Sequence, residues 1–193
     1  ASHIVRDACD QVPELSEPGA SSTAVVSALR VWLASRVATG TSDISRYWEK
    51  STDDLYQALV DREETVLCGG INWMLMRLYD AFGLDAWVYN FGIDKATSGA
   101  PLGATHVVAV VHADGLDQVQ DAFYNTTLVD TMGHPLSVQD AVRRLSRREA
   151  STVRIQESRG TLRRAFLPRD VESLGAGQFC VITGAGGGVI TPE

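Results

Sequence analysis

The sequence predicts an α+β fold, in which N-terminal helices pack on a mostly antiparallel sheet. Helical spacing of apolar residues dominates the first half of the chain, and short apolar segments typical of strands dominate the second half. Asp114-Gly115, between two of these segments, is a strong signal for a tight hairpin. Helices followed by hairpin strands are typical of the α+β class.

The composition favours one soluble globular unit. The 193 residues are enough for a sizeable core, and we expect residues 1–193 to form a single domain. The apolar share of 45% and the charged share of 21% are ordinary. The net charge of -7 argues against nucleic-acid binding, and no apolar run is long enough for a bilayer. No signal peptide is evident, which favours the cytoplasm over export.

Three helices are predicted before the sheet. Residues 1–20 contain Pro13 and Pro18 and are expected to form an irregular arm. Residues 21–23 offer an N-cap to a helix over 24–39. Ser51 and Asp54 form a capping-box-like pair at the start of a second helix. A third helix begins near Cys68 and ends at Gly83, and its inward face carries Ile71, Leu75, Leu78 and Phe82.

The second half of the chain is predicted to form strands around one basic helix. The hairpin comprises strands over 105–112 and 116–124, and residues 92–103 form the loop before it. Ser137 caps a helix that extends to about Arg148. The C-terminal part, 126–193, is therefore a basic helix plus strands, and the further strands are expected over 84–91, 152–155 and 178–182.

Cysteine and histidine spacing gives no sign of a metal or a cofactor. Cys9, Cys68 and Cys180 are too few and too far apart for a disulfide framework. A bridge between Cys9 and Cys180 stays open if the protein is exported. His3, His112 and His134 lack metal-ligand spacing, and the glycines of 184–188 precede no helix that could bind a dinucleotide.

Cys68 is the candidate nucleophile. It precedes Gly69-Gly70 and a long helical pattern, so its thiol is expected at a helix N-terminus, where the local field favours a thiolate. The glycines allow close approach of a substrate, and a nearby backbone N–H could stabilise an oxyanion. The alternative is a buried cysteine that acts only as a small apolar residue.

His106 and Asp121 are the candidate base and its orienting carboxylate. If Asp114-Gly115 forms the turn, Asp121 pairs with Val108 and His106 pairs with Phe123. His106 and Asp121 then lie diagonally on one face of the hairpin, within hydrogen-bonding reach. Asp117 and Asp114 share this face but lie nearer the turn. The alternative is a surface His–Asp pair without a catalytic role.

The order of these elements resembles the transglutaminase-like core of the papain-related thiol enzymes. The resemblance covers about residues 48–125 and rests on Leu67-Cys68-Gly69-Gly70, Ala104-Thr105-His106-Val107-Val108 and Val119-Gln120-Asp121-Ala122-Phe123. Arylamine N-acetyltransferases share this core, and 68–70 and 105–108 look similar to theirs. The aromatic residue that usually follows the nucleophile is replaced by Gly69, so the oxyanion arrangement departs from the family's pattern.

The resemblance implies cysteine-dependent acyl transfer on a peptide, amide or thioester carbonyl, with a Cys68–His106–Asp121 triad and no cofactor. Gly69, Trp48 and Gln57 are candidates for oxyanion or substrate contacts, whereas Trp73 and Trp87 are expected in the core. Hydrolysis and transfer to an amine both remain open, and so does a non-catalytic scaffold on the same fold.

A basic face is also predicted on the helix after Ser137. It comprises Arg143, Arg144, Arg147 and Arg148. This face is either merely solvated or a site for an anionic partner such as an acyl carrier.

Overall fold

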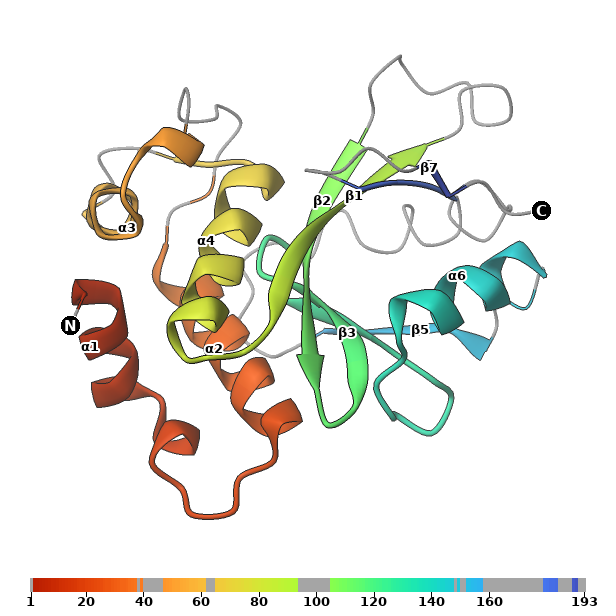
Figure 1. The fold of residues 1–193 in the computed structure, drawn as a ribbon, viewed down its shortest axis with the longest axis horizontal. Coiled ribbons are helices and arrows are strands. Elements are labelled where there is room, and N and C mark those ends of the chain that lie inside the picture. Colours follow the sequence, from red (N-terminus) through yellow and green to blue (C-terminus); the bar gives the residue numbers. More distant parts are fainter. Residues whose placement is uncertain are drawn as a thin grey trace.

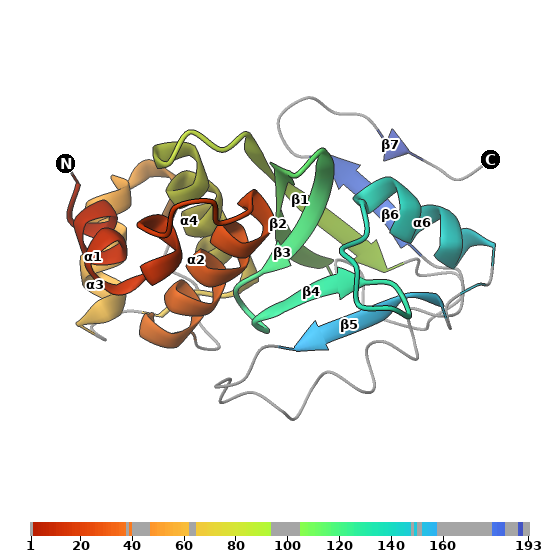
Figure 2. The ribbon, with the colours of Figure 1, turned by 90° about the horizontal axis from the view of Figure 1, so that it is seen from below.

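The computed structural model describes residues 2–37, 39, 47–61, 65–93, 105–147, 149, 152–157, 179–183 and 189–190. In this part of the chain a layer of helices covers one face of an antiparallel sheet, and a further helix lies on the other face (Figures 1 and 2). The predicted α+β class is therefore confirmed.

The helical layer is built from capped, amphipathic segments. Ser21 Oγ accepts a hydrogen bond from the Ala24 N–H at the start of α2, and Ser51 Oγ accepts one from the Asp54 N–H at the start of α3. Gly83 follows α4 with φ 74°, as expected for a helix stop. The elements are α1 (His3–Gln11), η1 (Pro13–Leu15), α2 (Ser22–Arg36), η2 (Tyr47–Glu49), α3 (Thr52–Val60) and α4 (Cys68–Ala81).

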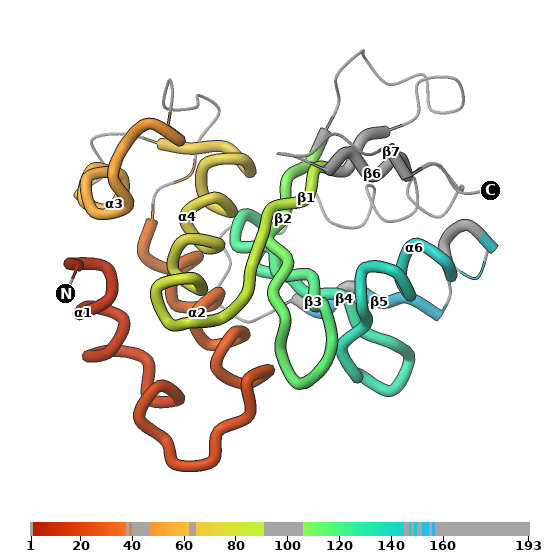
Figure 3. The backbone as a smooth tube through the Cα atoms, in the orientation of Figure 1, coloured from red at the N-terminus to blue at the C-terminus, as the bar shows by residue number. Residues whose placement is uncertain are grey.

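The prediction of an irregular arm over 1–20 was wrong, because the chain begins with helix α1 (Figure 3). Ser2 caps this helix through the Val5 N–H, and Ile4 and Ala8 are buried. The Ile4 N–H also donates to Asp53 Oδ1 of α3 at 3.2 Å. A nine-residue helix with so few apolar residues depends on such tertiary contacts, which its own sequence does not reveal.

Seven strands of the described chain form one sheet, in the order β5-β4-β3-β2-β1-β6-β7, and every pairing is antiparallel. Helix α6 (Val138–Ser146) follows β4, and Ser137 Oγ caps it by accepting from the Asp140 N–H. The strands are β1 (Ala86–Ile93), β2 (Thr105–Ala113), β3 (Leu116–Asp121), β4 (Thr126–Val129), β5 (Arg154–Glu157), β6 (Phe179–Thr183) and β7 (Val189–Ile190).

The β2–β3 hairpin has the predicted register near its turn. Asp114 and Gly115 both have positive φ, 50° and 78°, as a type I′ turn requires. Ala109 pairs with Gln120 and Ala113 pairs with Leu116. These pairs follow the register derived from the Asp-Gly turn.

The return strand is shorter than predicted, and β4 was missed. β3 ends at Asp121 instead of Tyr124, so Phe123 does not pair with His106 in the ladder. Asp121 Oδ1 accepts from the Phe123 N–H at 2.9 Å and thereby bends the chain. Asn125, with φ 55°, completes the turn into β4.

The predicted loop over 92–103 begins later than expected, because β1 extends to Ile93. The rest of this predicted loop up to residue 103 lies outside the described residues.

Alternate residues of β2 divide the core between the two faces of the sheet. Ala109, Val111 and Ala113 pack with the helical layer. Val108 and Val110 pack on the opposite face with Val138 of α6. This alternation follows from the period of two in a strand. Helix α4, which begins at Cys68, packs against β2, the strand that carries His106.

Candidate active site

The candidate nucleophile, Cys68, is the first residue of α4. Leu67, the N-cap residue, is extended, and its side chain makes no capping hydrogen bond. The first backbone N–H groups of a helix have no partner within the helix, and with the helix dipole they favour an anion. The Cys68 thiol is partly buried at this point. The Cys68 thiol therefore lies at the N-terminus of α4, where the helix dipole favours a thiolate, as predicted from the sequence.

The structure brings Cys68, His106 and Asp121 together in one row, in which His106 is hydrogen-bonded to Asp121. His106 Nε2 lies 2.7 Å from Asp121 Oδ2. The His106 ring and the Val107 backbone also lie close enough to the Cys68 thiol to lower its pKa. Because Nε2 faces the carboxylate, Nδ1 is the ring nitrogen left for the thiol.

The row favours a thiolate beside an imidazolium. Burial alone would raise the pKa of Cys68, but the hydrogen bonds and charge of His106, together with the Val107 N–H, hold this pKa below its ordinary value. Burial would also lower the pKa of His106, yet Asp121 and the Cys68 sulfur raise it to about 10. The Asp121 side chain is only 6% exposed, so its charge is poorly screened.

Asp121 stays ionised in spite of its burial. Desolvation opposes the charge, but His106 and two further donors outweigh it and lower the pKa of Asp121. The Asn72 amide donates to Asp121 Oδ1 at 3.0 Å, and the Phe123 N–H donates to the same oxygen at 2.9 Å. The other oxygen, Oδ2, is thereby left to the imidazole ring.

Asn72 of α4 binds Asp121 and the backbone beside His106, and the sequence interpretation missed it. It lies one turn after Cys68 on α4 and is fully buried. Its Nδ2 donates to the Val107 carbonyl at 2.8 Å as well as to Asp121, and its Oδ1 accepts from the Ala122 N–H at 2.8 Å. The only available signal was one amide within the inward apolar stripe of the helix, which a structural residue would give equally well.

A second buried polar group, Arg30 of α2, supports the turn after Asp121. Its Nε donates to Gln120 Oε1 and its Nη1 donates to Asn125 Oδ1, both at 2.8 Å. Arg30 is 2% exposed, and its burial lowers the pKa of the guanidinium, while the charge of Asp121 acts in the opposite direction. No pattern in the sequence indicated that this helix residue contacts the hairpin.

The other acidic residues of the hairpin have different partners. Asp117 Oδ1 lies 2.8 Å from Nδ1 of the exposed His112. Asp114 accepts from the Ser22 and Thr23 N–H groups and so caps the start of α2. Neither of these two carboxylates contacts His106 in the hydrogen bonds that they form.

The three residues proposed for oxyanion or substrate contacts lie in different places. Gly69 is buried beside Cys68, and Trp48 of η2 is 56% exposed near it. Gln57 is exposed on α3, and its amide donates to Asp61 Oδ2 at 2.8 Å. Gly69 and Trp48 therefore line the same pocket, whereas the helical position of Gln57 directs its side chain to solvent.

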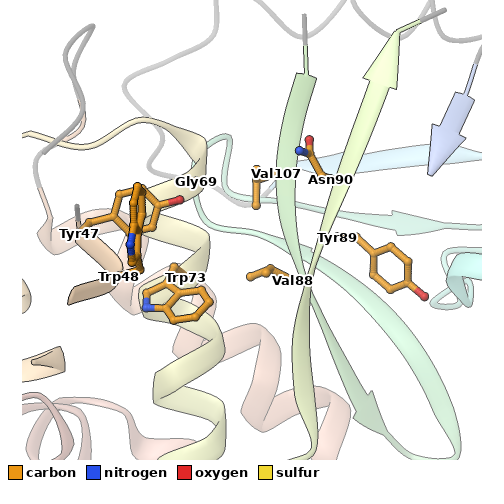
Figure 4. A pocket seen from close by; sticks show the side chains of 8 residues that line it. All are labelled: Tyr47, Trp48, Gly69, Trp73, Val88, Tyr89, Asn90 and Val107. Carbon is orange, nitrogen blue, oxygen red and sulfur yellow. The ribbon is translucent and has the colours of Figure 1, made fainter. Parts of the chain in front are cut away.

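A pocket of about 320 Å³ lies between the start of α4 and strands β1 and β2 (Figure 4). Gly69 and Val107, the chain neighbours of Cys68 and His106, both line it. Trp73, which was expected in the core, lines this pocket instead, whereas Trp87 packs on the other face of the sheet. The further lining side chains drawn on the α4 side of the sheet are Tyr47, Trp48, Val88 and Asn90.

The basic face lies on α6, across the sheet from the helical layer (Figures 1 and 2). Arg143 pairs with Asp140, and Arg144 Nη1 donates to the Thr152 carbonyl at 3.1 Å. Arg147 is exposed. Arg148 lies outside the described residues. Two of the predicted cations thus already have partners within the chain.

The described residues were also compared with what a metal site, a membrane-spanning helix and a disulfide would require. The described residues contain no group of three or more His, Cys, Asp or Glu side chains that could hold a metal ion. Among the described helices, none combines the length and apolar character needed to cross a membrane. Cys9 is an exposed free thiol of α1, and the side chain of Cys180 lies outside the described residues.

No protein-family model and no curated protein matches the chain. A solved structure described as a TGase, a transglutaminase, is similar with a TM-score of 0.44 and 17% identity over 62% of this chain and 30% of that one. A candidate cysteine protease from Cytophaga hutchinsonii is similar with a TM-score of 0.43 and 15% sequence identity. The match covers 80% of this chain and 47% of that protein. The chain thus spans less than half of either protein.

Proposed function

We propose that this chain is a thiol enzyme that transfers acyl groups through an acyl-Cys68 intermediate. The observation that supports this most directly is the row of Cys68, His106 and Asp121, in which His106 is hydrogen-bonded to Asp121, the pKa of the thiol is lowered and that of the imidazole is raised. A nucleophile at a helix start, activated by a base that a carboxylate orients, is the arrangement this chemistry requires.

Acylation begins with attack of the Cys68 thiolate on the carbonyl carbon of an amide or thioester. The new C–S bond forms as the carbonyl electron pair moves to oxygen. The intermediate then collapses, the bond to the leaving amine or thiol breaks, and the His106 imidazolium delivers its Nδ1 proton to that group. Asp121 keeps the ring oriented and stabilises its charge throughout.

Deacylation reverses these roles with water or an amine as acceptor. Neutral His106 removes a proton from the acceptor as it attacks the acyl-cysteine. Collapse of the second intermediate releases the product and the Cys68 thiolate, and the imidazolium is restored. Hydrolysis and transfer differ only in the acceptor, so the same row serves both.

Stabilisation of the oxyanion is assigned to hydrogen-bond donors at the start of α4. The backbone N–H groups of Cys68 and Gly69 belong to the uncapped first turn, where a developing negative charge is favoured. The Trp48 indole N–H, near Gly69 at the pocket, is a candidate side-chain donor. This arrangement accommodates Gly69 where the resembling family has an aromatic residue.

Incubation with p-nitrophenyl acetate tests the proposal. The expected result is an acetyl adduct on Cys68, detected by intact-protein and peptide mass spectrometry, and release of p-nitrophenol faster than from buffer. Cys68→Ala and His106→Ala should abolish the adduct, and Cys9→Ala should not. An accelerated decay of the adduct on addition of a primary amine would assign transfer, and decay unaffected by the amine would assign hydrolysis.

Equal and slow acetylation of the cysteines, with no dependence on His106, would instead support the non-catalytic scaffold. The basic face of α6 stays a separate proposal for an anionic partner, since it lies across the sheet from the row. An Arg143→Ala, Arg144→Ala, Arg147→Ala and Arg148→Ala variant that acylates Cys68 normally would argue against a role of this face in delivering the acyl group.

A further inference from the structure

We propose that the aromatic rings of Phe123 and Tyr124 form a wall against the His106 imidazole, which fixes the orientation of this ring and stabilises its positive charge. The inference rests on the proposed function, because it assigns two positioning residues to the same site. Both residues lie outside the row of Cys68, His106 and Asp121, and neither ring has to contact the substrate.

The rings of His106, Phe123 and Tyr124 all contact one another. The centroids of the His106 and Tyr124 rings are 5.0 Å apart, with 41° between the ring planes. The Phe123 centroid lies 6.1 Å from that of His106, at 62°. Phe123 and Tyr124 meet edge to face at 5.0 Å and 85°. These distances are within the range of about 4.5–7 Å that is typical of aromatic pairs, so His106 lies against two rings that support each other.

The turn after β3 places the wall. β3 ends at Asp121, and Asp121 Oδ1 accepts from the Phe123 N–H at 2.9 Å and from the Tyr124 N–H at 3.4 Å. The other oxygen, Oδ2, lies 2.7 Å from His106 Nε2. One carboxylate therefore holds the imidazole with one oxygen and the backbone of both aromatic residues with the other.

Phe123 anchors the wall to the interior. It is half-buried and packs against the core of the helical layer. Side chains packed in a core occupy defined rotamers, so this ring gives the half-buried Tyr124 ring a fixed surface to rest on. The imidazole thus meets a wall that is itself held in place.

The wall favours the protonated form of His106. A cation within about 6 Å of an aromatic centroid is attracted by the π-system, and the attraction grows as water is excluded. The Tyr124 centroid is within this distance and the Phe123 centroid is at its limit. The His106 side chain is 30% exposed, so the contact is partly desolvated. A neutral imidazole lacks this attraction, and the imidazolium is the form that protonates the leaving group.

NMR of the whole chain with isotope-labelled histidine rings tests the proposal, by following protonation of His106 between about pH 6 and about pH 11. His106→Ala identifies its signal among those of the four histidines. The variants are Tyr124→Leu, which removes the ring, and Tyr124→Phe, which removes only the titratable hydroxyl. Trp87→Leu is the matched control, because Trp87 pairs with Val110, four residues from His106 along β2.

We expect Tyr124→Leu to lower the pH midpoint of His106 deprotonation by about 1 unit, because the cation loses its aromatic partner. Tyr124→Phe and Trp87→Leu should leave this midpoint within about 0.3 unit. Acetylation of Cys68 by p-nitrophenyl acetate should slow about 10-fold in Tyr124→Leu, since the imidazole is less well oriented, and should be retained in Tyr124→Phe. The other titratable groups that act on His106, Asp121 of β3 and Cys68 of α4, are kept in every variant.

The contact itself is measured on the unmodified protein, so the test does not depend on whether a variant folds. Nuclear Overhauser effects between the His106 and Tyr124 ring protons are expected, and their absence would overturn the proposal.

An unchanged midpoint in Tyr124→Leu, or an equal shift in Tyr124→Phe or Trp87→Leu, would overturn the wall. The proposed function would survive this result if acetylation of Cys68 still required His106. Acetylation that is slow and independent of His106 would instead remove the proposed function, and the NMR midpoints would still decide whether the rings stabilise the imidazolium.

Discussion

His106 Nε2 lies 2.7 Å from Asp121 Oδ2, although the two residues do not pair directly in the β2–β3 ladder. The ladder ends one residue before Asp121, and the Asp121 carboxylate turns the chain by accepting the Phe123 N–H. Asp121 therefore has a structural role in the turn as well as its contact with the imidazole. A substitution at Asp121 must therefore be shown to leave the fold intact before a change in thiol reactivity is attributed to the contact with His106.

Asp121→Asn should reduce alkylation of Cys68 at about pH 7 by about 10²-fold, because an amide cannot stabilise the imidazolium that keeps the thiol ionised. The amide oxygen can still accept from the Phe123 N–H, so the fold should be retained. Asp117→Asn is the matched control, since Asp117 forms an exposed pair with His112 on the same hairpin. Equal rates in the two variants would contradict the role of Asp121.

Asn72→Ala should lower both stability and thiol reactivity. It leaves the Ala122 N–H and the Val107 carbonyl without a partner in a buried site, at a cost of about 2–4 kcal/mol in unfolding free energy. Asp121 also loses a donor. The pH midpoint of Cys68 alkylation should therefore move upward, which urea unfolding and alkylation rates measure separately. A loss of stability with an unchanged midpoint would assign Asn72 a structural role alone.

Gly69→Ala should disturb the pocket more than the fold. A Cβ at this position would lie 2.6 Å from Tyr47 Oη, so the phenol must move. Alanine gains about 1 kcal/mol of helix propensity over glycine, which offsets part of the strain. We expect weaker saturation by aromatic chloroacetamides and little change in unfolding.

Tyr47→Phe in the same chain removes the closest atom and leaves the next contact at 3.4 Å. It should therefore restore much of the probe binding lost in Gly69→Ala. Loss of binding that persists in the double variant would show that Tyr47 does not transmit the effect.

The stability that the Cys68 thiolate and the His106 imidazolium contribute should depend on pH through the titration of both groups. The pKa of His106 rises from 6.5 to about 10 on folding, so its contribution is complete below pH 6.5 and is lost as the pH rises through about 10. The pKa of Cys68 falls below 9.0, so its contribution is complete above that pH and is lost as the pH falls through the lowered pKa.

The two contributions together predict that the difference in unfolding free energy between the protein and a Cys68→Ser, His106→Gln variant decreases as the pH rises from 9.0 through about 10, where the Cys68 contribution is already complete and the His106 contribution is being lost. Urea unfolding from about pH 5 to about pH 10 measures this difference. A difference that does not vary with pH would mean that the pair is neutral in the folded protein.

The hairpin and the nucleophile helix could be predicted because their signals are local. Asp114-Gly115 fixed the register, and the register put His106 and Asp121 on one face. Cys68-Gly69-Gly70 before an apolar stripe located the start of α4. In each case a few neighbouring residues determine the conformation.

The supporting polar contacts could not be predicted, because they join distant parts of the chain. Asn72 and Arg30 reach residues far along the sequence, and an isolated polar residue on a helix does not indicate its partner. Helix α1 likewise depends on the contact of Ile4 with Asp53. Gln57 shows the opposite error, in which a suitable side chain near the nucleophile in sequence is directed away from it.

The pH profile of Cys68 alkylation by iodoacetamide tests the central claim most directly. We predict that the midpoint of this profile in the unmodified protein lies below 9.0, because His106 and the Val107 backbone lower the pKa of Cys68. In His106→Ala the midpoint should rise to 9.0 or above, since burial then dominates. A midpoint at or above 9.0 in the unmodified protein, unchanged in His106→Ala, would contradict the account.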